Sequence, residues 1–80
     1  MTLGEAVFKR LENILNERRI SMYKFLKDNA IPWSTMFNLK TGHTKSPSLN
    51  VIFQISKALC MTHLEFLNDS LFFNEEIDYL

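Results

Sequence analysis

Several features that shape small proteins are scarce in this chain, and each scarcity excludes a class of protein. A single cysteine, Cys60, cannot form an internal disulfide, so the chain is not a disulfide-stapled secreted scaffold. Two glycines and two prolines supply too few turn residues for an all-β fold. No apolar run approaches the ~20 residues of a membrane span, and the N-terminus lacks a signal-peptide pattern. We therefore expect a soluble, cytoplasmic protein without membrane contact.

Positive charge is missing from one end of the chain. The formal net charge is zero, but residues 1–60 carry all nine Lys and Arg side chains and only four of the nine acids. Residues 61–80 carry the other five acids, so the formal charges of the two parts are +5 and −5. This division is typical of a basic body that meets an anionic partner, with an acidic tail held away from it. Chance asymmetry of a solvated surface is the plainer alternative.

The composition that remains predicts one folded, all-helical domain. A hydrophobic content of 46% and an aromatic content of 12% exceed what a disordered chain contains. Apolar residues recur at helical spacing, which predicts a compact five-helix bundle over residues 1–70. Residues 71–80 form an acidic and apolar tail that is not expected to be a separate domain.

Start and stop signals divide this bundle into helices. Thr2 and Glu5 have the spacing of a capping box, as have Thr62 and Glu65. Ser21 and Ser48 are expected to cap the second and fourth helices, Pro32 to begin the third, and Gly42 to end it. Lys9, Arg10 and Glu12 are expected on the solvent side of the first helix. The side chains expected to face the core are Val7, Leu11, Ile14, Leu15, Phe25, Leu26, Met36, Leu39, Leu49, Ile52, Ile55, Ala58, Leu59, Leu64, Phe66 and Leu67.

The segment from Ile20 to Pro47 is the most informative part of the chain. It predicts two short helices, about 21–29 and 33–40, joined by a tight turn and followed by a polar, basic loop. This is the layout of a helix-turn-helix, whose second helix lies in the DNA major groove. Met36 and Leu39 give that helix only a narrow buried stripe. The outward positions are then Trp33, Ser34, Phe37, Asn38 and Thr41, which is unusual for a purely structural helix.

These residues resemble the helix-turn-helix family of phage Cro and CI repressors, also called the XRE family. The resemblance covers about Leu11 to Leu67. Its motifs are ERRIS-MYKF, IPWSTMFNLKTGHTKSPS around the third helix, and ISKALCMTHLEFL at the end. The resemblance implies a five-helix bundle that binds double-stranded DNA at a palindromic operator, usually as a homodimer. It also implies a transcriptional regulator, most often a repressor.

The chain departs from the family pattern at four positions. Met22 replaces a frequent Gln that grips a phosphate, and Leu26 replaces a small residue where the second and third helices cross. Ala30 and Cys60 stand where the family has Gly in turns. A positive φ costs a non-glycine residue about 1 kcal/mol. Either these two turns differ from those of the family or that cost is accepted.

By this correspondence, Trp33, Ser34, Phe37 and Asn38 contact bases. Asn38 can pair with adenine through two hydrogen bonds, and Trp33 or Phe37 can pack on a thymine methyl group, so we expect an A·T-leaning half-site. Alternatively, Trp33 folds back onto the second helix and Asn38 is simply solvated. The expected phosphate contacts come from the start of the second helix, nearby lysines and the loop after the third helix. They are Ser21, Met22, Lys24, Lys40, His43, Thr44 and Lys45.

The C-terminal tail supplies the candidates for a dimer contact. The last expected helix, about 62–67, and the tail contain more apolar side chains than a monomer needs, and such an excess is typical of an interaction surface. The alternative is a tail that covers the core of its own chain. The candidates are Phe72, Phe73, Ile77, Tyr79 and Leu80.

No pattern of enzymatic chemistry is present in the sequence. Cys60 lies among apolar residues and is expected to pack, and His43 and His63 lack the spacing of a zinc site. We expect no catalytic residues, metal, cofactor or small-molecule ligand. The second functional hypothesis is a protein-binding module, of antitoxin or anti-repressor type, that has kept the bundle but lost DNA binding.

Overall fold

The computed structural model describes residues 1–74 and 76–78 of the chain. Within these residues there are five α-helices and one short 3-10 helix, and the only β pairing is an isolated bridge. The predicted all-α, five-helix architecture is confirmed. The elements are α1 (Leu3–Arg18), α2 (Met22–Asp28), α3 (Trp33–Lys40), α4 (Leu49–Ala58), α5 (His63–Leu67) and the 3-10 helix η1 (Ser70–Phe73).

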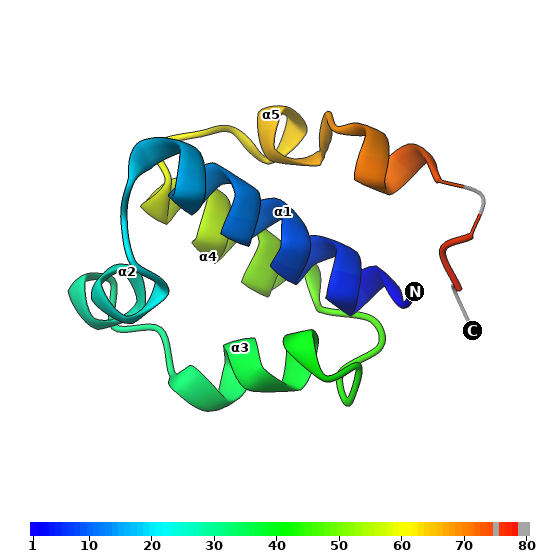
Figure 1. Ribbon diagram of the computed structural model, residues 1–80, viewed down its shortest axis with the longest axis horizontal. Coiled ribbons are helices and arrows are strands. Elements are labelled where there is room, and N and C mark those ends of the chain that lie inside the picture. The colour runs from blue at the N-terminus through cyan, green and yellow to red at the C-terminus, as the bar shows by residue number, and fades with distance from the viewer. Residues whose placement is uncertain (75, 79–80) are drawn as a thin grey trace.

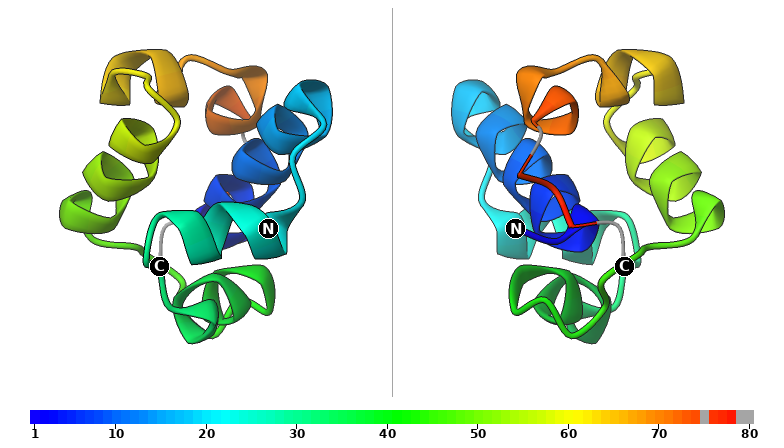
Figure 2. Two further views of the ribbon diagram at one scale, coloured as in Figure 1. Left: turned by 90° about the vertical axis from the view of Figure 1, so that its left-hand side faces the viewer. Right: turned by 90° about the vertical axis from the view of Figure 1, so that its right-hand side faces the viewer.

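The longest helix, α1, lies at the centre of the molecule (Figure 1). The α2–α3 pair lies on one side of it and α5 with η1 on the other, while α4 packs behind it (Figures 1 and 2). None of the helices in the described part of the chain is long and apolar enough to cross a membrane.

The predicted helix starts are confirmed. The Thr2 hydroxyl accepts a hydrogen bond from the Glu5 amide at 3.0 Å, and the Glu5 carboxylate accepts one from the Thr2 amide at 2.8 Å. Thr62 and Glu65 form the same reciprocal pair at the start of α5. Pro32 takes the N-cap position of α3, one residue before its expected place in the first turn. Each capped amide is one that the helix itself cannot satisfy.

The core draws on all five helices. Phe66 is fully buried, and Met36 and Leu39 are each 1% exposed, as expected for the narrow inner stripe of α3. The prediction is wrong for Leu49 and Leu64, which are 72% and 70% exposed, because each lies in the first turn of its helix, beyond the edge of the core. The buried cluster consists of Val7, Leu11, Ile14, Leu15, Phe25, Leu26, Ile31, Met36, Leu39, Ile52, Ile55, Leu59 and Phe66.

Three helices end in left-handed turns without glycine. Arg19, Ala30 and Cys60 have φ values of 59°, 52° and 59°. In each case the next amide bonds back to the helix, as Ile31 does to the Leu26 carbonyl at 2.9 Å, which closes the turn in the Schellman manner. The cost of positive φ is therefore accepted at Ala30 and Cys60. The Cys60 side chain is exposed rather than packed, since the left-handed turn carries it off the core.

The described part of the tail packs on its own chain. Ile77 is 5% exposed, and the Asp78 amide donates a hydrogen bond to the Met1 carbonyl at 2.8 Å beside a Thr2–Asp78 bridge. Figure 2 shows this segment returning alongside the start of α1. The Phe72 ring lies 6.2 Å from that of Phe66, centroid to centroid.

The dimer-contact candidates are thus divided by the structure. Phe72 and Ile77 are engaged within their own chain, which favours the alternative in which the tail covers its own core. Phe73 is 70% exposed. Tyr79 and Leu80 lie outside the described residues.

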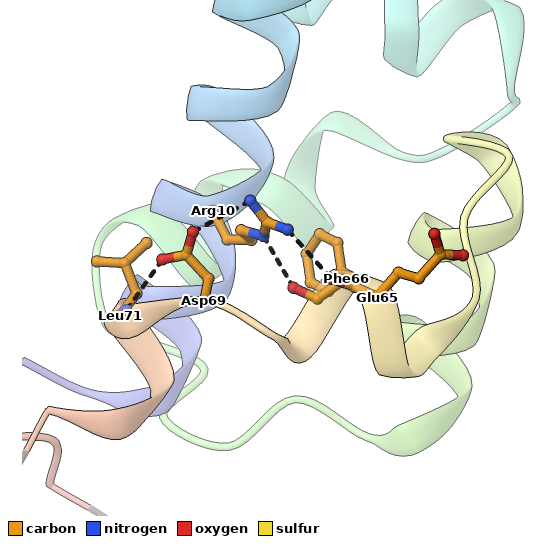
Figure 3. A network of polar contacts seen from close by, with 5 residues as sticks. All are labelled: Arg10, Glu65, Phe66, Asp69 and Leu71. Atoms are coloured by element: carbon orange, nitrogen blue, oxygen red, sulfur yellow. Dashed lines mark hydrogen bonds and ion pairs between the residues drawn. The ribbon is translucent and has the colours of Figure 1, made fainter.

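Arg10 ties α1 to α5 and η1 (Figure 3). Its guanidinium donates to the Phe66 carbonyl at 2.8 Å and the Glu65 carbonyl at 3.1 Å, and pairs with Asp69 at 3.2 Å. The Asp69 carboxylate also accepts the Leu71 amide at 3.0 Å, so it holds the start of η1 as well. The prediction that Arg10 faces solvent is wrong. Its long side chain reaches carbonyls in the last turn of α5, and it shares the Glu65 carbonyl with the Asn68 amide, which donates to that oxygen at 3.3 Å.

Candidate nucleic-acid interface

The two helices of the predicted motif, α2 and α3, are joined by a short turn. The α2 helix ends at Asp28, Ala30 adopts the left-handed conformation, and Ile31 is buried between the helices. Pro32 then starts α3 in an extended conformation. Burial of Met36 and Leu39 fixes the rotation of α3 about its axis and therefore decides which side chains remain outside.

The outer face of α3 carries the predicted base-contacting residues. Trp33 is 57% exposed, Phe37 is 51% exposed, and Ser34 is also exposed. Asn38 is half-buried, and its carbonyl accepts a hydrogen bond from the Thr44 amide at 2.9 Å. The structure thus brings these four residues onto one helix surface.

A hollow of about 200 Å³ lies between α1, the start of α2 and α3. Ser21 and Met22 line it from α2, and Trp33, Phe37 and Lys40 line it from α3. The start of α2, predicted to meet a phosphate, therefore lies beside the face predicted to meet bases.

A second hollow, of about 500 Å³, lies on the other side of Trp33. Its walls are Tyr23, Leu26, Lys27, Ile31 and Trp33. Trp33 therefore forms the ridge between two hollows. It shares the larger hollow with residues of α2, but more than half of its surface stays exposed, so it does not fold back onto α2 as the alternative interpretation expected.

Sequence reasoning missed Tyr23 and Lys27 as members of this surface. Tyr23 is 71% exposed, and both residues border the larger hollow. Their spacing of four places both side chains on one side of α2, and this was the available signal.

The loop from Thr41 to Ser48 is held against the start of α1. The Gly4 amide donates to the Lys45 carbonyl at 3.0 Å, and a β-carbon at Gly4 would overlap the Thr44 carbonyl oxygen. Gly42, with φ of 78°, allows the chain to leave α3, as predicted. The sequence did not predict a role for Gly4, because no local pattern in the first turn of a helix indicates that a distant loop packs closely against it.

The predicted phosphate-contacting groups differ in their exposure and in the contacts that they already make within the chain. The Lys24 ammonium lies 3.5 Å from the Asp28 carboxylate, and the Lys40 ammonium lies 5.9 Å from the centre of the Phe8 ring. The Thr44 amide is already used by Asn38, so His43, Thr44 and Lys45 offer side chains rather than that amide. His43 and Lys45 are exposed. Both Lys24 and Ser21 are also exposed, whereas Met22 is half-buried.

The chemistry available on this surface is that of recognition. Among the described residues, no three His, Cys, Asp or Glu side chains converge as a metal site would require. The surface offers instead aromatic rings, an amide, hydroxyls and ammonium groups. These are the groups that contact base edges and phosphates in DNA complexes.

A family comparison agrees with this geometry. The model of the Cro/C1-type HTH DNA-binding domain matches residues 10–69, about three quarters of the chain. Searches of curated proteins and of solved structures found no significantly similar chain. The matched range contains α2, α3, the loop after α3 and both later helices. The chain therefore belongs to the Cro/C1-type helix-turn-helix family of DNA-binding domains.

Proposed function

We propose that this protein is a sequence-specific transcriptional regulator, acting as a repressor, that places α3 in the major groove of double-stranded DNA. The observation that carries the proposal is the exposed face of α3 within a matched DNA-binding domain. Trp33, Ser34, Phe37 and Asn38 are the base-contacting residues of the proposed complex. They occupy the first two turns of α3, where such contacts are made in helix-turn-helix proteins.

Phosphate contacts in this complex come from both sides of α3. Ser21, Met22 and Lys24 at the start of α2 meet one strand, and His43, Thr44 and Lys45 meet the other. Lys40 lies between them on the hollow beside α1. Such contacts set the position of the protein on the duplex without reading its sequence.

The proposed complex is a homodimer on a palindromic operator. One domain of this size makes too few base contacts for a unique site, and two-fold pairing places half-sites ~34–36 Å apart. The dimer contact requires apolar side chains away from α3. In the described part of the chain, the large apolar side chains exposed away from the α2–α3 face are Met1, Leu49, Phe53, Leu64 and Phe73.

The test is selection of bound sequences from a randomised duplex pool at ~0.1 M salt, followed by a salt titration. The proposal expects an enriched palindrome and an affinity whose logarithm falls with log salt by roughly 0.9 per neutralised phosphate. Negligible retention and no enrichment at any salt concentration would overturn it.

A protein-binding role is the second candidate, favoured by one specific observation. Tyr23, Trp33 and Phe37 are exposed aromatic residues beside the two hollows, and aromatic residues are enriched at the centres of protein interfaces. An apolar protein interface responds weakly to salt, so the same titration separates the two functions.

A further inference from the structure

We propose that the α3 face distinguishes bases mainly by the C5-methyl group of thymine, which Trp33 and Phe37 contact in the major groove. This inference rests on the proposed DNA-binding function and specifies the chemical group that is read. The preferred substrate is then duplex DNA that presents thymine methyl groups beneath these two rings.

The first step is that α3 lacks the groups that read guanine. Guanine is most often recognised by Arg or Lys through its O6 and N7 atoms. The helix, WSTMFNLK, contains no Arg and one Lys. The ammonium of that residue, Lys40, is directed toward α1, 5.9 Å from the centre of the Phe8 ring.

The second step is that the polar groups on the same face are short or engaged. Asn38 is half-buried, and the Thr41 hydroxyl donates a hydrogen bond to the Phe37 carbonyl at 3.0 Å. Ser34 is exposed but carries only a hydroxyl, which can bond to several bases. Hydrogen bonding from this face therefore supplies adenine recognition at Asn38 and little other discrimination.

The third step is that the largest exposed groups are apolar and adjacent. Trp33 and Phe37 are four residues apart on α3, so their rings project from one side of the helix. Both border the hollow that Met22 also lines, and Trp33 borders the larger, mostly apolar one. A methyl group is the apolar feature that a major groove presents, and only thymine among the standard bases carries it. Burying one methyl group against these rings favours binding by about fourfold.

The experiment uses the operator obtained by selection and replaces its thymines one at a time by deoxyuridine, which removes only the methyl group. We expect about fourfold weaker binding by the wild-type protein at one or two positions in each half-site. Trp33→Ala and Phe37→Ala variants should bind the thymine duplex more weakly and no longer distinguish it from the deoxyuridine duplex. Ser34→Ala removes a proposed base-contacting hydroxyl from the same face, so it should weaken binding of both duplexes but keep the distinction between them. Gln54→Ala, at an exposed position on α4, is the control that should change neither the affinity nor the distinction.

The possible failures are separable. If the wild-type protein binds every deoxyuridine duplex as tightly as the thymine duplex, the methyl inference is overturned while the DNA-binding function stands. If the Trp33 and Phe37 variants keep the full thymine preference, these rings are not the reading groups. If no duplex is bound at all, both proposals fail and a protein partner is indicated. Both side chains are about half exposed, so we expect each variant to fold. Thermal unfolding of each variant checks this.

Discussion

Two regions of this molecule place a cation 5.9 Å from an aromatic ring, and they use that arrangement differently. At the α5–η1 end, Arg10 lies over Phe66, which is fully buried, and its guanidinium also bonds to two carbonyls and a carboxylate. At the α3 face, Lys40 lies over the half-buried Phe8, beside Trp33 and Phe37, which stay exposed. The cationic group of the first region is saturated by contacts within the chain, whereas the aromatic rings beside Lys40 in the second region stay exposed.

The two regions are expected to contribute differently to the free energy of unfolding. Contacts made within the folded chain contribute to the free energy of unfolding, while exposed side chains contribute little to it. Substitutions at the two ends should therefore affect different measurements. The Arg10 end should control stability and the α3 face should control DNA affinity.

The largest expected effect is at Arg10. Arg10→Met removes the ion pair with Asp69 and the hydrogen bonds to the Phe66 and Glu65 carbonyls, at a cost of about 2–3 kcal/mol in the free energy of unfolding. Urea or thermal unfolding measures this loss. Lys9→Met is the matched control, since Lys9 pairs with Glu12 at 3.1 Å on an exposed surface, and such a pair contributes under about 1 kcal/mol. Equal losses in the two variants would remove the distinction between the regions.

Trp33→Ala should have the opposite pattern. Because the ring is 57% exposed, the free energy of unfolding should change by less than about 1 kcal/mol. Affinity for the selected operator should fall roughly tenfold or more, as expected when an aromatic anchor is removed. A fluorescence anisotropy titration measures the affinity. A variant that unfolds easily but binds normally would show that Trp33 belongs to the structural region.

Gly4→Ala should affect both measurements, because Gly4 lies where α1 meets the loop at the end of the α3 face. The new β-carbon would overlap the Thr44 carbonyl and must displace the loop that carries His43 and Lys45. Such overpacking costs about 1–3 kcal/mol of stability, and the displaced loop should weaken operator binding as well. Ala6→Gly, a destabilising substitution two residues away, is the control. Ala6→Gly should lower the free energy of unfolding, but the folded fraction of this variant should bind the operator with unchanged affinity.

Cys60→Gly should stabilise the chain slightly. Its φ of 59° lies in the left-handed region, where glycine avoids the steric cost, so a gain of about 0.5–1 kcal/mol is expected. The side chain is exposed, so no core contact is lost. Urea unfolding would detect the gain, and operator affinity should not change. A loss of stability would indicate that Cys60 makes a packing contribution.

The smallest effect concerns pH. The hydrogen bonds from Thr2 and Thr62 lower the pKa of Glu5 and Glu65 below the ordinary value of 4.5. A carboxyl whose folded-state pKa is lowered stabilises the fold above its unfolded pKa, and that contribution is lost as the pH falls through the folded value. Stability should therefore decline below about pH 4.5. Glu65→Gln should flatten this decline in urea unfolding measured from pH 6 to pH 3, whereas Glu76→Gln, at an exposed position, should leave it unchanged.

Local signals predicted most of the fold. The bounds of α3, both capping boxes and the Gly42 turn all depend on residues within four positions of one another. Each represents a local hydrogen-bonding or dihedral preference, which the sequence displays directly.

Contacts between distant residues could not be predicted in this way. Arg10 bonds to carbonyls more than 50 residues away, and helical periodicity placed it on the solvent side. Leu49 fits the apolar spacing of α4 but lies beyond the core. The candidate site was predicted at α3, where outward positions follow from Met36 and Leu39. The contributions of Gly4 and Tyr23 depend on how α1, α2 and the loop pack together, which no local pattern specifies.

In the proposed complex the α2–α3 face binds DNA, whereas the Arg10 end stabilises the fold. The most direct test is NMR titration of the ¹⁵N-labelled protein with its selected operator. The account predicts that the largest amide shifts occur at the start of α2, along α3 and in the loop around Lys45, with small shifts in α5 and η1. Largest shifts in α5 and η1, with α3 unaffected, would contradict it.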